Sequence, residues 1–247
     1  MVAQRAILMA AGMGTRMRPL TETMPKPLID VNGKPMIETV IDGLMGRGIE
    51  DITVVTGYLG EQFEVLKEKY PFVKIVKNPD YSTINNISSL YYARQALKGA
   101  DCFICEADLY VSDASMFQTK LDKSCYFGKY VAGHSDDWVF DTSDDGIITR
   151  VGKVGDDRYN MCGIAYFKER EAGIIADAIE EQYGKGGYAD MFWDDVVNNH
   201  LEELQLVVHP VKENQIVEID TVEELEEVRK AEGQSISQED SVGKGEE

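Results

Sequence analysis

Short apolar runs alternate with longer amphipathic stretches along most of this sequence. The runs are mostly four to seven residues long, and the stretches between them carry apolar residues at helical spacing. This alternation is typical of strands and crossover helices packed around a mostly parallel sheet, so we predict an α/β fold with helices on both faces. The predicted strands are Ala6–Met9, Ile52–Thr56, Val73–Val76, Cys102–Cys105, Tyr126–Ala132, Ile147–Val151, Met161–Phe167 and Leu206–Val211, and the predicted helices are Pro35–Arg47, Glu61–Tyr70, Ile87–Leu97, Glu169–Tyr183, Ala189–Leu201 and Val222–Ala231.

The length of the chain and its polar last segment indicate how many domains it forms. A chain of 247 residues suits one large α/β domain, and we predict a single domain over 1–231. Residues 232–247 lose all apolar periodicity and are predicted to form a polar linker or a disordered tail. The aromatic strands within Tyr126–Val151 and the Asp-rich turn from Asp141 to Gly146 predict a small antiparallel insertion that forms a lid or wall of the substrate site.

Charge and cysteine content exclude several classes of partner. The 44 acidic and 25 basic residues leave a net charge of −19, which repels phosphate backbones and anionic membranes, so we expect neither nucleic acid nor a membrane as partner. No stretch reaches the roughly 18 apolar residues of a membrane span, and the first residues do not resemble a signal peptide. Four scattered cysteines do not suit a disulfide scaffold, so we expect a cytoplasmic protein in which Cys102 and Cys105 are buried strand residues.

The segment AILMAAGMGTRMRPLTETMPKPL is the most informative part of the sequence for function. A strand that runs into Gly12 and Gly14 presents bare backbone N–H groups at the carboxyl end of a sheet, where a phosphate can approach closely. Met17 stands where a dinucleotide fingerprint needs its third glycine, and no G-x-x-x-x-G-K-[ST] motif occurs. The segment therefore indicates a nucleotide site of another kind, with a solvated basic loop as the alternative. The cations that follow the glycines are Arg16, Arg18 and Lys26.

This opening resembles that of the nucleotidyltransferase family, which makes nucleotide-activated sugars and alcohols and begins with an apolar strand, A-A-G-x-G-[TS]-R and a downstream P-K. The resemblance implies a single Rossmann-like nucleotidyltransferase domain whose loop wraps the triphosphate. It also implies that Arg16 contacts the β- and γ-phosphates and that Lys26 neutralises the α-phosphate, roles that suit a forked donor and a compact point charge. The remaining loop residues of the expected nucleotide site are Ala10, Ala11, Gly12, Gly14 and Thr15.

Two aspartates follow apolar runs at positions that suit metal ligands. Asp108 follows the buried run CFICEA, and Asp220 follows IVEI just before a Thr221-x-x-Glu224 capping box. Nucleotidyl transfer needs a divalent cation to screen charge, and Mg²⁺ prefers one or two carboxylates together with phosphate oxygens and water. The resemblance implies that Asp108 and Asp220 hold Mg²⁺. From spacing alone, Asp108 could instead form a turn, and Asp220 could lie just outside a helix cap.

Within this family the sequence is most similar to the bacterial CTP:phosphocholine cytidylyltransferases. The likeness departs at Glu106, where an aspartate is expected. Asn85 and Asn86 could read the edge of a nucleobase, because amides both donate and accept hydrogen bonds, or could cap the helix that follows them. Ser88 and Glu106 complete the predicted nucleotide-binding set. The segments that carry the likeness are Asn85-Asn86, Ser88 to Tyr91, Glu106 to Asp108, Trp138, Cys162-Gly163, Phe192 to Asp194 and Val217 to Asp220.

The same resemblance implies a pocket for the trimethylammonium group of choline. Such a group is held by aromatic faces with a carboxylate nearby, through cation–π and charge attraction. Aromatic side chains form cores more often than cages, so the same residues could instead pack in the interior. The candidate cage residues are Trp138, Tyr159, Phe192 and Trp193, and the candidates for the counter-charge are Asp190, Asp194 and Glu218.

These observations predict a cytidylyltransferase that moves CMP from CTP to phosphocholine with the help of Mg²⁺. Its predicted catalytic residues are Lys26, Arg16, Asp108 and Asp220. The nearest alternative keeps this chemistry with a sugar 1-phosphate or 2-aminoethylphosphonate as acceptor. A metal-dependent glycosyltransferase, which Glu106-x-Asp108 would suit, and a nucleotide-sensing subunit without turnover are further alternatives. The polar tail could join the domain to a choline kinase.

Overall fold

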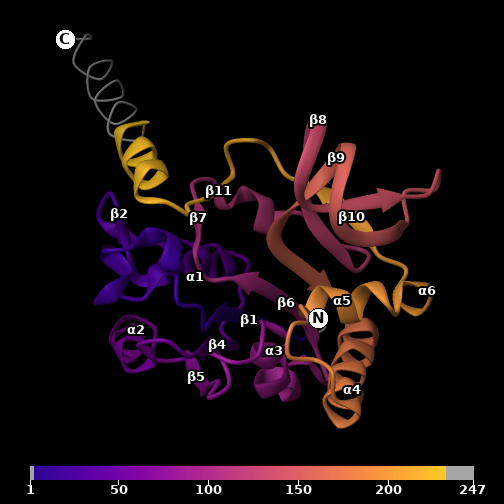
Figure 1. The fold of residues 1–247 in the computed structure, drawn as a ribbon, viewed down its shortest axis with the longest axis horizontal. Coiled ribbons are helices and arrows are strands. Elements are labelled where there is room, and N and C mark those ends of the chain that lie inside the picture. Colours follow the sequence, from indigo (N-terminus) through magenta and orange to yellow (C-terminus); the bar gives the residue numbers. More distant parts are fainter. Residues whose placement is uncertain (1–2, 232–247) are drawn as a thin grey trace.

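The computed structural model describes residues 3–231, which fold around a seven-stranded sheet (Figure 1). Four neighbouring pairs of strands are parallel, and the two pairs that involve β9 (Ile148–Phe167) are antiparallel. This arrangement confirms the predicted mixed, mostly parallel α/β sheet. From one edge to the other, the strands are β10 (Val207–Pro210), β8 (Cys125–Thr142), β9 (Ile148–Phe167, the antiparallel member), β6 (Asp101–Glu106), β1 (Gln4–Ala10), β4 (Ile52–Thr56) and β5 (Lys74–Lys77).

Helices cover both faces of this sheet, because successive side chains of the central strands point to opposite sides. In β1, Ala6 and Leu8 pack against one set of helices and Ile7 against the other. Both sides of β1 are therefore buried, as expected of a central strand. The first set is α1 (Met36–Gly46) and α2 (Leu66–Lys69), and the second is α3 (Ile87–Ala93), α4 (Glu169–Lys185), α5 (Trp193–Asn198) and α6 (Leu201–Leu204); a last helix spans 222–231.

The four cysteines are buried and free. Cys105 packs in the cluster that contains α1, and Cys102 packs in the cluster that contains α3 and α4. The prediction that these two residues lie on opposite faces of a strand is confirmed.

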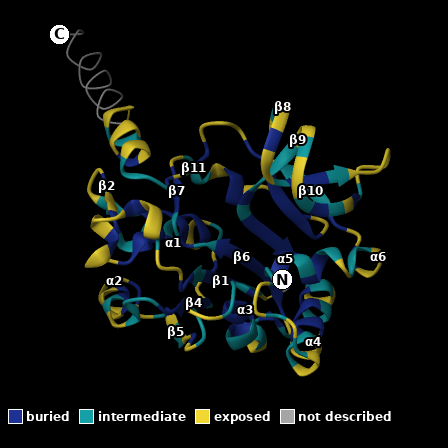
Figure 2. Cartoon of the chain, in the orientation of Figure 1, coloured by how far each residue is buried: buried dark blue, intermediate teal, exposed yellow. Residues whose placement is uncertain are grey.

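The antiparallel insertion is larger than the sequence predicts. The predicted strands Ile147–Val151 and Met161–Phe167 are two parts of the single strand β9, and Tyr126–Ala132 is the first part of β8. Residues 152–160 are mostly polar and exposed, so they lack the alternation that marks a half-buried strand, yet they pair with β8. We call this hairpin, residues 125–167, the arm; it extends from the sheet, and its far part is exposed (Figures 1 and 2).

Three predicted helices are shorter as α-helices than the sequence predicts. The predicted helix Glu61–Tyr70 begins as a 3₁₀ helix, and Ile87–Leu97 ends as one. The predicted helix Ala189–Leu201 begins only at Trp193, because Asn85 donates hydrogen bonds to the carbonyls of residues 189 and 190 and holds them outside the helix.

Two short strands that the sequence analysis missed are important for the site. β7 (Leu109–Val111) pairs antiparallel with β11 (Ile216–Glu218), and Leu109 lies opposite Glu218. This register brings Asp108 and Asp220 together, although more than a hundred residues separate them in the sequence. Another short pair consists of β2 (Asp30–Val31) and β3 (Lys34–Pro35).

Two expectations concern membranes and the end of the chain. None of the helices formed by residues 3–231 is long and apolar enough to cross a membrane. The polar segment predicted at 232–247 lies outside the described residues.

Candidate active site

A cavity of about 350 Å³ opens at the carboxyl ends of β1 and β6. This end of the sheet is where α/β folds usually bind ligands. The cavity gathers most of the predicted catalytic and nucleotide-binding residues from distant parts of the chain. The predicted residues that line it are Ala10, Ala11, Gly12, Gly14, Thr15, Arg16, Lys26, Asn86, Glu106, Asp108, Glu218 and Asp220.

The glycine loop after β1 has a conformation that depends on Gly14. This residue has a φ of 57°, in the left-handed region that favours glycine. A Cβ atom here would lie 2.9 Å from Cβ of Lys26, so the loop and the lysine segment could not pack as closely. Thr21 Oγ1 donates a 2.8 Å hydrogen bond to the Gly14 carbonyl and holds the turn. The second glycine of the G-x-G-T-R pattern is thus required because a side chain at this position would clash with Lys26.

Lys26 lies at the centre of the site. Its side chain is only 7% exposed, and Nζ lies 2.7 Å from Oδ2 of Asp108 and 2.7 Å from Oδ1 of Asp220. Arg16 Nη2 lies 2.9 Å from the same Asp220 oxygen. Burial opposes the charge on Lys26, but the two carboxylates outweigh it and raise the pKa of the lysine above its usual value. The lysine is therefore protonated and positively charged at neutral pH.

Four carboxyl groups, those of Glu106, Asp108, Glu218 and Asp220, lie around this lysine in the cavity. Burial and the neighbouring Asp108 raise the pKa of Glu106 well above its usual range. Burial and the charges of Asp220 and Asp108 raise the pKa of Glu218 to about 7. Gly163 makes room for Glu106, because a Cβ there would meet Glu106 Oε2 at 2.7 Å. Burial and mutual repulsion thus favour the neutral forms of both glutamates, and a nearby cation would favour their ionised forms.

The donor set fits Mg²⁺, the ion that the sequence analysis predicts. The Asp108 and Asp220 carboxylates converge on one cationic centre, the Lys26 ammonium, and carboxylate oxygens are the ligands that Mg²⁺ prefers. No group of three or more His, Cys, Asp or Glu side chains among the described residues forms a ready metal cage. Mg²⁺ usually takes one or two carboxylates with phosphate oxygens, so two aspartates suffice if a triphosphate supplies the rest.

A side pocket of about 140 Å³ adjoins the cavity at the glycine loop. Asn85, Asn86 and Ser88 line it, together with Ser89, which sequence reasoning missed. Ser89 lies three residues after Asn86 on α3, so helical spacing places it on the same face and could have revealed it. Asn86 does not cap α3 with its side chain; its Oδ1 accepts a 3.0 Å hydrogen bond from the Trp193 backbone.

Two of the predicted cage residues meet in a half-buried position, whereas Trp193 and the predicted counter-charge Asp194 lie in the core. Trp138 from the arm and Phe192 meet edge to face, with ring centroids 5.3 Å apart. Trp193 is 4% exposed and packs in the core, stacked on Tyr126. Asp194 is equally buried and accepts a 2.9 Å hydrogen bond from the Tyr126 hydroxyl, and its burial raises its pKa to about 7.

The other predicted acceptor residues lie apart from this aromatic pair. Tyr159 contacts Tyr130 within the arm. Asp190 is exposed, and its carbonyl accepts a hydrogen bond from Asn85. Lys153, which sequence reasoning missed, has its Nζ 5.8 Å from the ring centroid of Trp138 and 5.4 Å from that of Phe192. No sequence signal marked it, because it lies in the polar part of β9.

Comparison with known proteins agrees with this arrangement. The sequence pattern of the family described as Nucleotidyl transferase matches residues 5–124. Over 220 residues, 89% of each chain, the protein is 54% identical to a 2-aminoethylphosphonate cytidylyltransferase of Lancefieldella rimae. Over 237 residues, 92% of this chain and 99% of the relative, it is 37% identical to a choline-phosphate cytidylyltransferase of Streptococcus pneumoniae.

A solved structure of a cytidylyltransferase has the same fold as this chain. The CTP:phosphocholine cytidylyltransferase from Streptococcus pneumoniae superposes with a TM-score of 0.85 at 34% identity, covering 93% of this chain and 99% of that one. The resemblance to the bacterial choline-phosphate enzymes that the sequence analysis identified is thus confirmed. The glycine loop, the Lys26 cluster, the sheet and these matches together show that the chain belongs to the nucleotidyl transferase family.

Proposed function

We propose that this enzyme transfers CMP from CTP to 2-aminoethylphosphonate and releases pyrophosphate. The observation that carries the proposal is the convergence of Lys26, Asp108 and Asp220 beside the glycine loop, which suits a triphosphate with its cation. The choice of nucleotide and acceptor follows the relative with 54% identity, whose name specifies this reaction. The same clamp argues against a glycosyltransferase, which does not need to hold a triphosphate, and against a subunit without turnover.

In the proposed reaction, a phosphonate oxygen attacks the α-phosphorus of CTP in line. The bond from that phosphorus to the oxygen bridging to the β-phosphate breaks, and pyrophosphate leaves. The Lys26 ammonium turns from the two aspartates to the α-phosphate, where charge develops in the transition state. Arg16, whose side chain is 69% exposed, reaches the β- and γ-phosphates, and the loop amides around Gly12 donate hydrogen bonds to them.

Asp108 and Asp220 are the proposed Mg²⁺ ligands. The ion supplies positive charge that screens the phosphates from one another and from the attacking oxygen. If the Lys26 ammonium turns to a phosphate, the oxygens of Asp108 and Asp220 would be free to hold the ion.

The side pocket is the proposed site of the cytosine ring. Its amide and hydroxyl groups, from Asn85, Asn86 and Ser88, can donate to the carbonyl of the base and accept from its amino group. Its position next to Gly12 suits a base whose phosphates lie on the glycine loop.

Phosphocholine, the acceptor that the sequence analysis predicts, is the second candidate. The edge-to-face pair of Trp138 and Phe192 supports it, because aromatic faces bind a trimethylammonium group. A cytoplasmic location and a link to a choline kinase stay predictions.

The test is to measure pyrophosphate release with Mg²⁺ for each of the four nucleoside triphosphates against three acceptors. The acceptors are 2-aminoethylphosphonate, phosphocholine and glucose 1-phosphate. We expect turnover with CTP and a higher kcat/KM for 2-aminoethylphosphonate than for phosphocholine. A higher kcat/KM for phosphocholine would select the second candidate, and turnover with glucose 1-phosphate alone would overturn both.

A further inference from the structure

The aromatic pair Trp138 and Phe192 already holds an ammonium group that belongs to the protein itself. Nζ of Lys153 lies over both rings, 5.8 Å and 5.4 Å from their centroids. Within residues 3–231, Lys153 forms no ion pair with a carboxylate, so a salt bridge does not account for its position. Both distances are within the range of a cation–π contact.

The strands of the arm place this lysine opposite the tryptophan. Trp138 on β8 and Lys153 on β9 are cross-strand partners, so their side chains stand next to each other on one face of the arm. Phe192 completes the contact from the segment before α5. The contact therefore follows from backbone register and does not depend on a chance rotamer alone.

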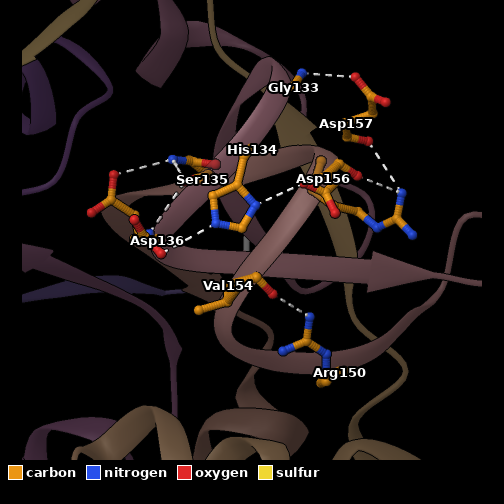
Figure 3. Close-up of polar contacts among 11 residues, drawn as sticks. Gly133, His134, Ser135, Asp136, Arg150, Val154, Asp156 and Asp157 are labelled. Carbon is orange, nitrogen blue, oxygen red and sulfur yellow. Dashed lines mark hydrogen bonds and ion pairs between the residues drawn. The ribbon is translucent and has the colours of Figure 1, made fainter.

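Arg150 fixes the backbone on which Lys153 stands. Its guanidinium donates a 3.0 Å hydrogen bond to the Val154 carbonyl (Figure 3). It also donates a 3.1 Å hydrogen bond to the Lys153 carbonyl. Asp141 holds the guanidinium in turn through a 2.6 Å ion pair. Gly152 leaves room for the arginine, because a Cβ there would lie 2.7 Å from its Nη1. One ion pair and two hydrogen bonds thus hold this part of β9.

Val154 is held in a conformation that its side chain disfavours. Its φ is 68°, and a β-branched residue rarely adopts a left-handed conformation. Such strain persists only where the surroundings over-determine it, and it is often found at ligand-binding sites. The contacts of Arg150 therefore stabilise a strained backbone conformation next to Lys153.

The segment that carries Phe192 is hydrogen-bonded to the wall of the active-site cavity. The backbone N–H of Trp193, the residue after Phe192, donates a 3.0 Å hydrogen bond to Asn86, and Asn86 lines the cavity. An acceptor with its phosphonate or phosphate oxygen near Lys26 would extend its other end toward this wall. The ammonium group of the acceptor and that of Lys153 then compete for the same rings.

We propose that Lys153 is a specificity-determining residue that disfavours quaternary-ammonium acceptors. A trimethylammonium group has no N–H donors, so it depends on aromatic faces, which Lys153 covers. A primary ammonium donates hydrogen bonds to carboxylates and carbonyls and depends less on the rings. This inference rests on the proposed function, since it concerns which ammonium-bearing acceptor that site selects.

The test compares wild-type protein with Lys153→Met, which keeps the length of the side chain and removes its charge. Phosphocholine binding is followed by fluorescence, with Trp138→Phe identifying the signal of that ring. Losing one exposed cation–π competitor should make phosphocholine bind about two- to fivefold tighter. The ratio of kcat/KM for phosphocholine to that for 2-aminoethylphosphonate should rise by a similar factor, mostly through KM.

Two further variants serve as controls. Lys153→Arg keeps a cation over the rings and should retain the wild-type preference. Lys120→Met removes the same charge from an exposed site, where the lysine pairs with Asp122, and should change neither binding nor turnover.

Unchanged or weaker phosphocholine binding in Lys153→Met would overturn the inference. An equal rise of KM for both acceptors would also overturn it, because Lys153 would then bind the anionic end that the two acceptors share. The binding measurement needs no turnover, so it decides the inference even if the wild-type enzyme uses neither acceptor; that last result would refute the proposed function separately.

Discussion

Lys26 pairs with two aspartates in the structure and is the residue proposed to bind the α-phosphate. Its ammonium nitrogen lies 2.7 Å from a carboxylate oxygen of Asp108 and 2.7 Å from one of Asp220. In the proposed complex, the carboxylates of Asp108 and Asp220 would hold Mg²⁺, and the Lys26 ammonium would contact a phosphate instead. Lys26 and the two aspartates would then have partners of opposite charge both before and after binding, which avoids the cost of an unpaired buried charge.

The first prediction concerns Lys26→Met, which keeps the buried stem of the side chain and removes the ammonium. We expect kcat to fall by about 10²–10³, because a donor aimed at developing charge in a buried site contributes about that factor. Steady-state pyrophosphate release measures it. Lys67→Met, at an exposed lysine that pairs with Glu64, is the control and should leave kcat unchanged. A Lys26→Met enzyme with near-normal kcat would refute the assignment.

Gly12 and Gly14 allow a second prediction, because they differ in what a methyl group would meet. Gly14→Ala places a Cβ 2.9 Å from Lys26 at a φ of 57°, so we expect a loss of about 1 kcal/mol or more of stability. Gly12→Ala meets no atom within 4 Å, so its stability should stay within about 0.5 kcal/mol of wild type while KM for CTP rises. Urea unfolding and CTP titration measure the two effects. Equal stabilities of the two variants would contradict this account.

At the scale of elements, the start of α4 depends on an aspartate from β6. Asp101, 2% exposed, accepts hydrogen bonds from the Glu169 backbone at 2.9 Å, from the Tyr166 hydroxyl at 2.6 Å and from Lys168 Nζ at 3.0 Å. Burial alone would raise its pKa, but these donors outweigh burial and hold the pKa below its usual value. The ionised carboxylate thus joins the helix to the sheet.

The third prediction is the pH dependence of this junction. Because the pKa of Asp101 is lower in the folded than in the unfolded protein, its contribution is complete above the unfolded value of about 3.9 and disappears as the pH falls through the folded value. Asp101→Asn should cost about 1–3 kcal/mol at pH 7, and the difference from wild type should shrink below about pH 4. Urea unfolding at several pH values measures this. Asp122→Asn, at an exposed aspartate, should show no such difference, and a constant gap for Asp101→Asn would contradict the prediction.

Elements were predictable from the sequence where burial imposes a pattern. The central strands bury both faces, so their apolar runs located them within two residues or so, and the glycine loop motif located the phosphate end of the site. The far part of the arm buries neither face, so its polar residues gave no strand signal. Phe192 and Trp193 are neighbours of like chemistry, and only the start of α5 decides which one packs in the core.

At the scale of the whole molecule, the site connects segments that are far apart in the sequence. Lys26 contacts Asp108, 82 residues away, and Asp220, 194 residues away. Asp220 directly precedes the last helix, where Thr221 and Glu224 form the capping box that the sequence predicts. A ligand bound here therefore holds the first and last parts of the domain together.

The fourth prediction follows from this connectivity. CTP with Mg²⁺ at about 100 times its Kd should raise the free energy of unfolding by about 2.7 kcal/mol. Excess EDTA should remove most of this gain, and Asp108→Asn or Asp220→Asn should reduce it, whereas Asp122→Asn should not. Thermal and urea unfolding with and without ligand measure the effect. Full stabilisation by CTP in EDTA would argue against a metal at these aspartates.

Because all four cysteines are buried, a thiol reagent should label only a cysteine introduced at the surface. Burial raises the pKa of Cys162 to about 11 and that of Cys125 to about 12, and the thiolate is the form that attacks a maleimide. We expect negligible modification of the native enzyme and four reactive thiols after unfolding, counted by mass spectrometry. A dye on Val154→Cys, at an exposed position of β9, would then report how the arm responds to each acceptor without any natural cysteine being replaced.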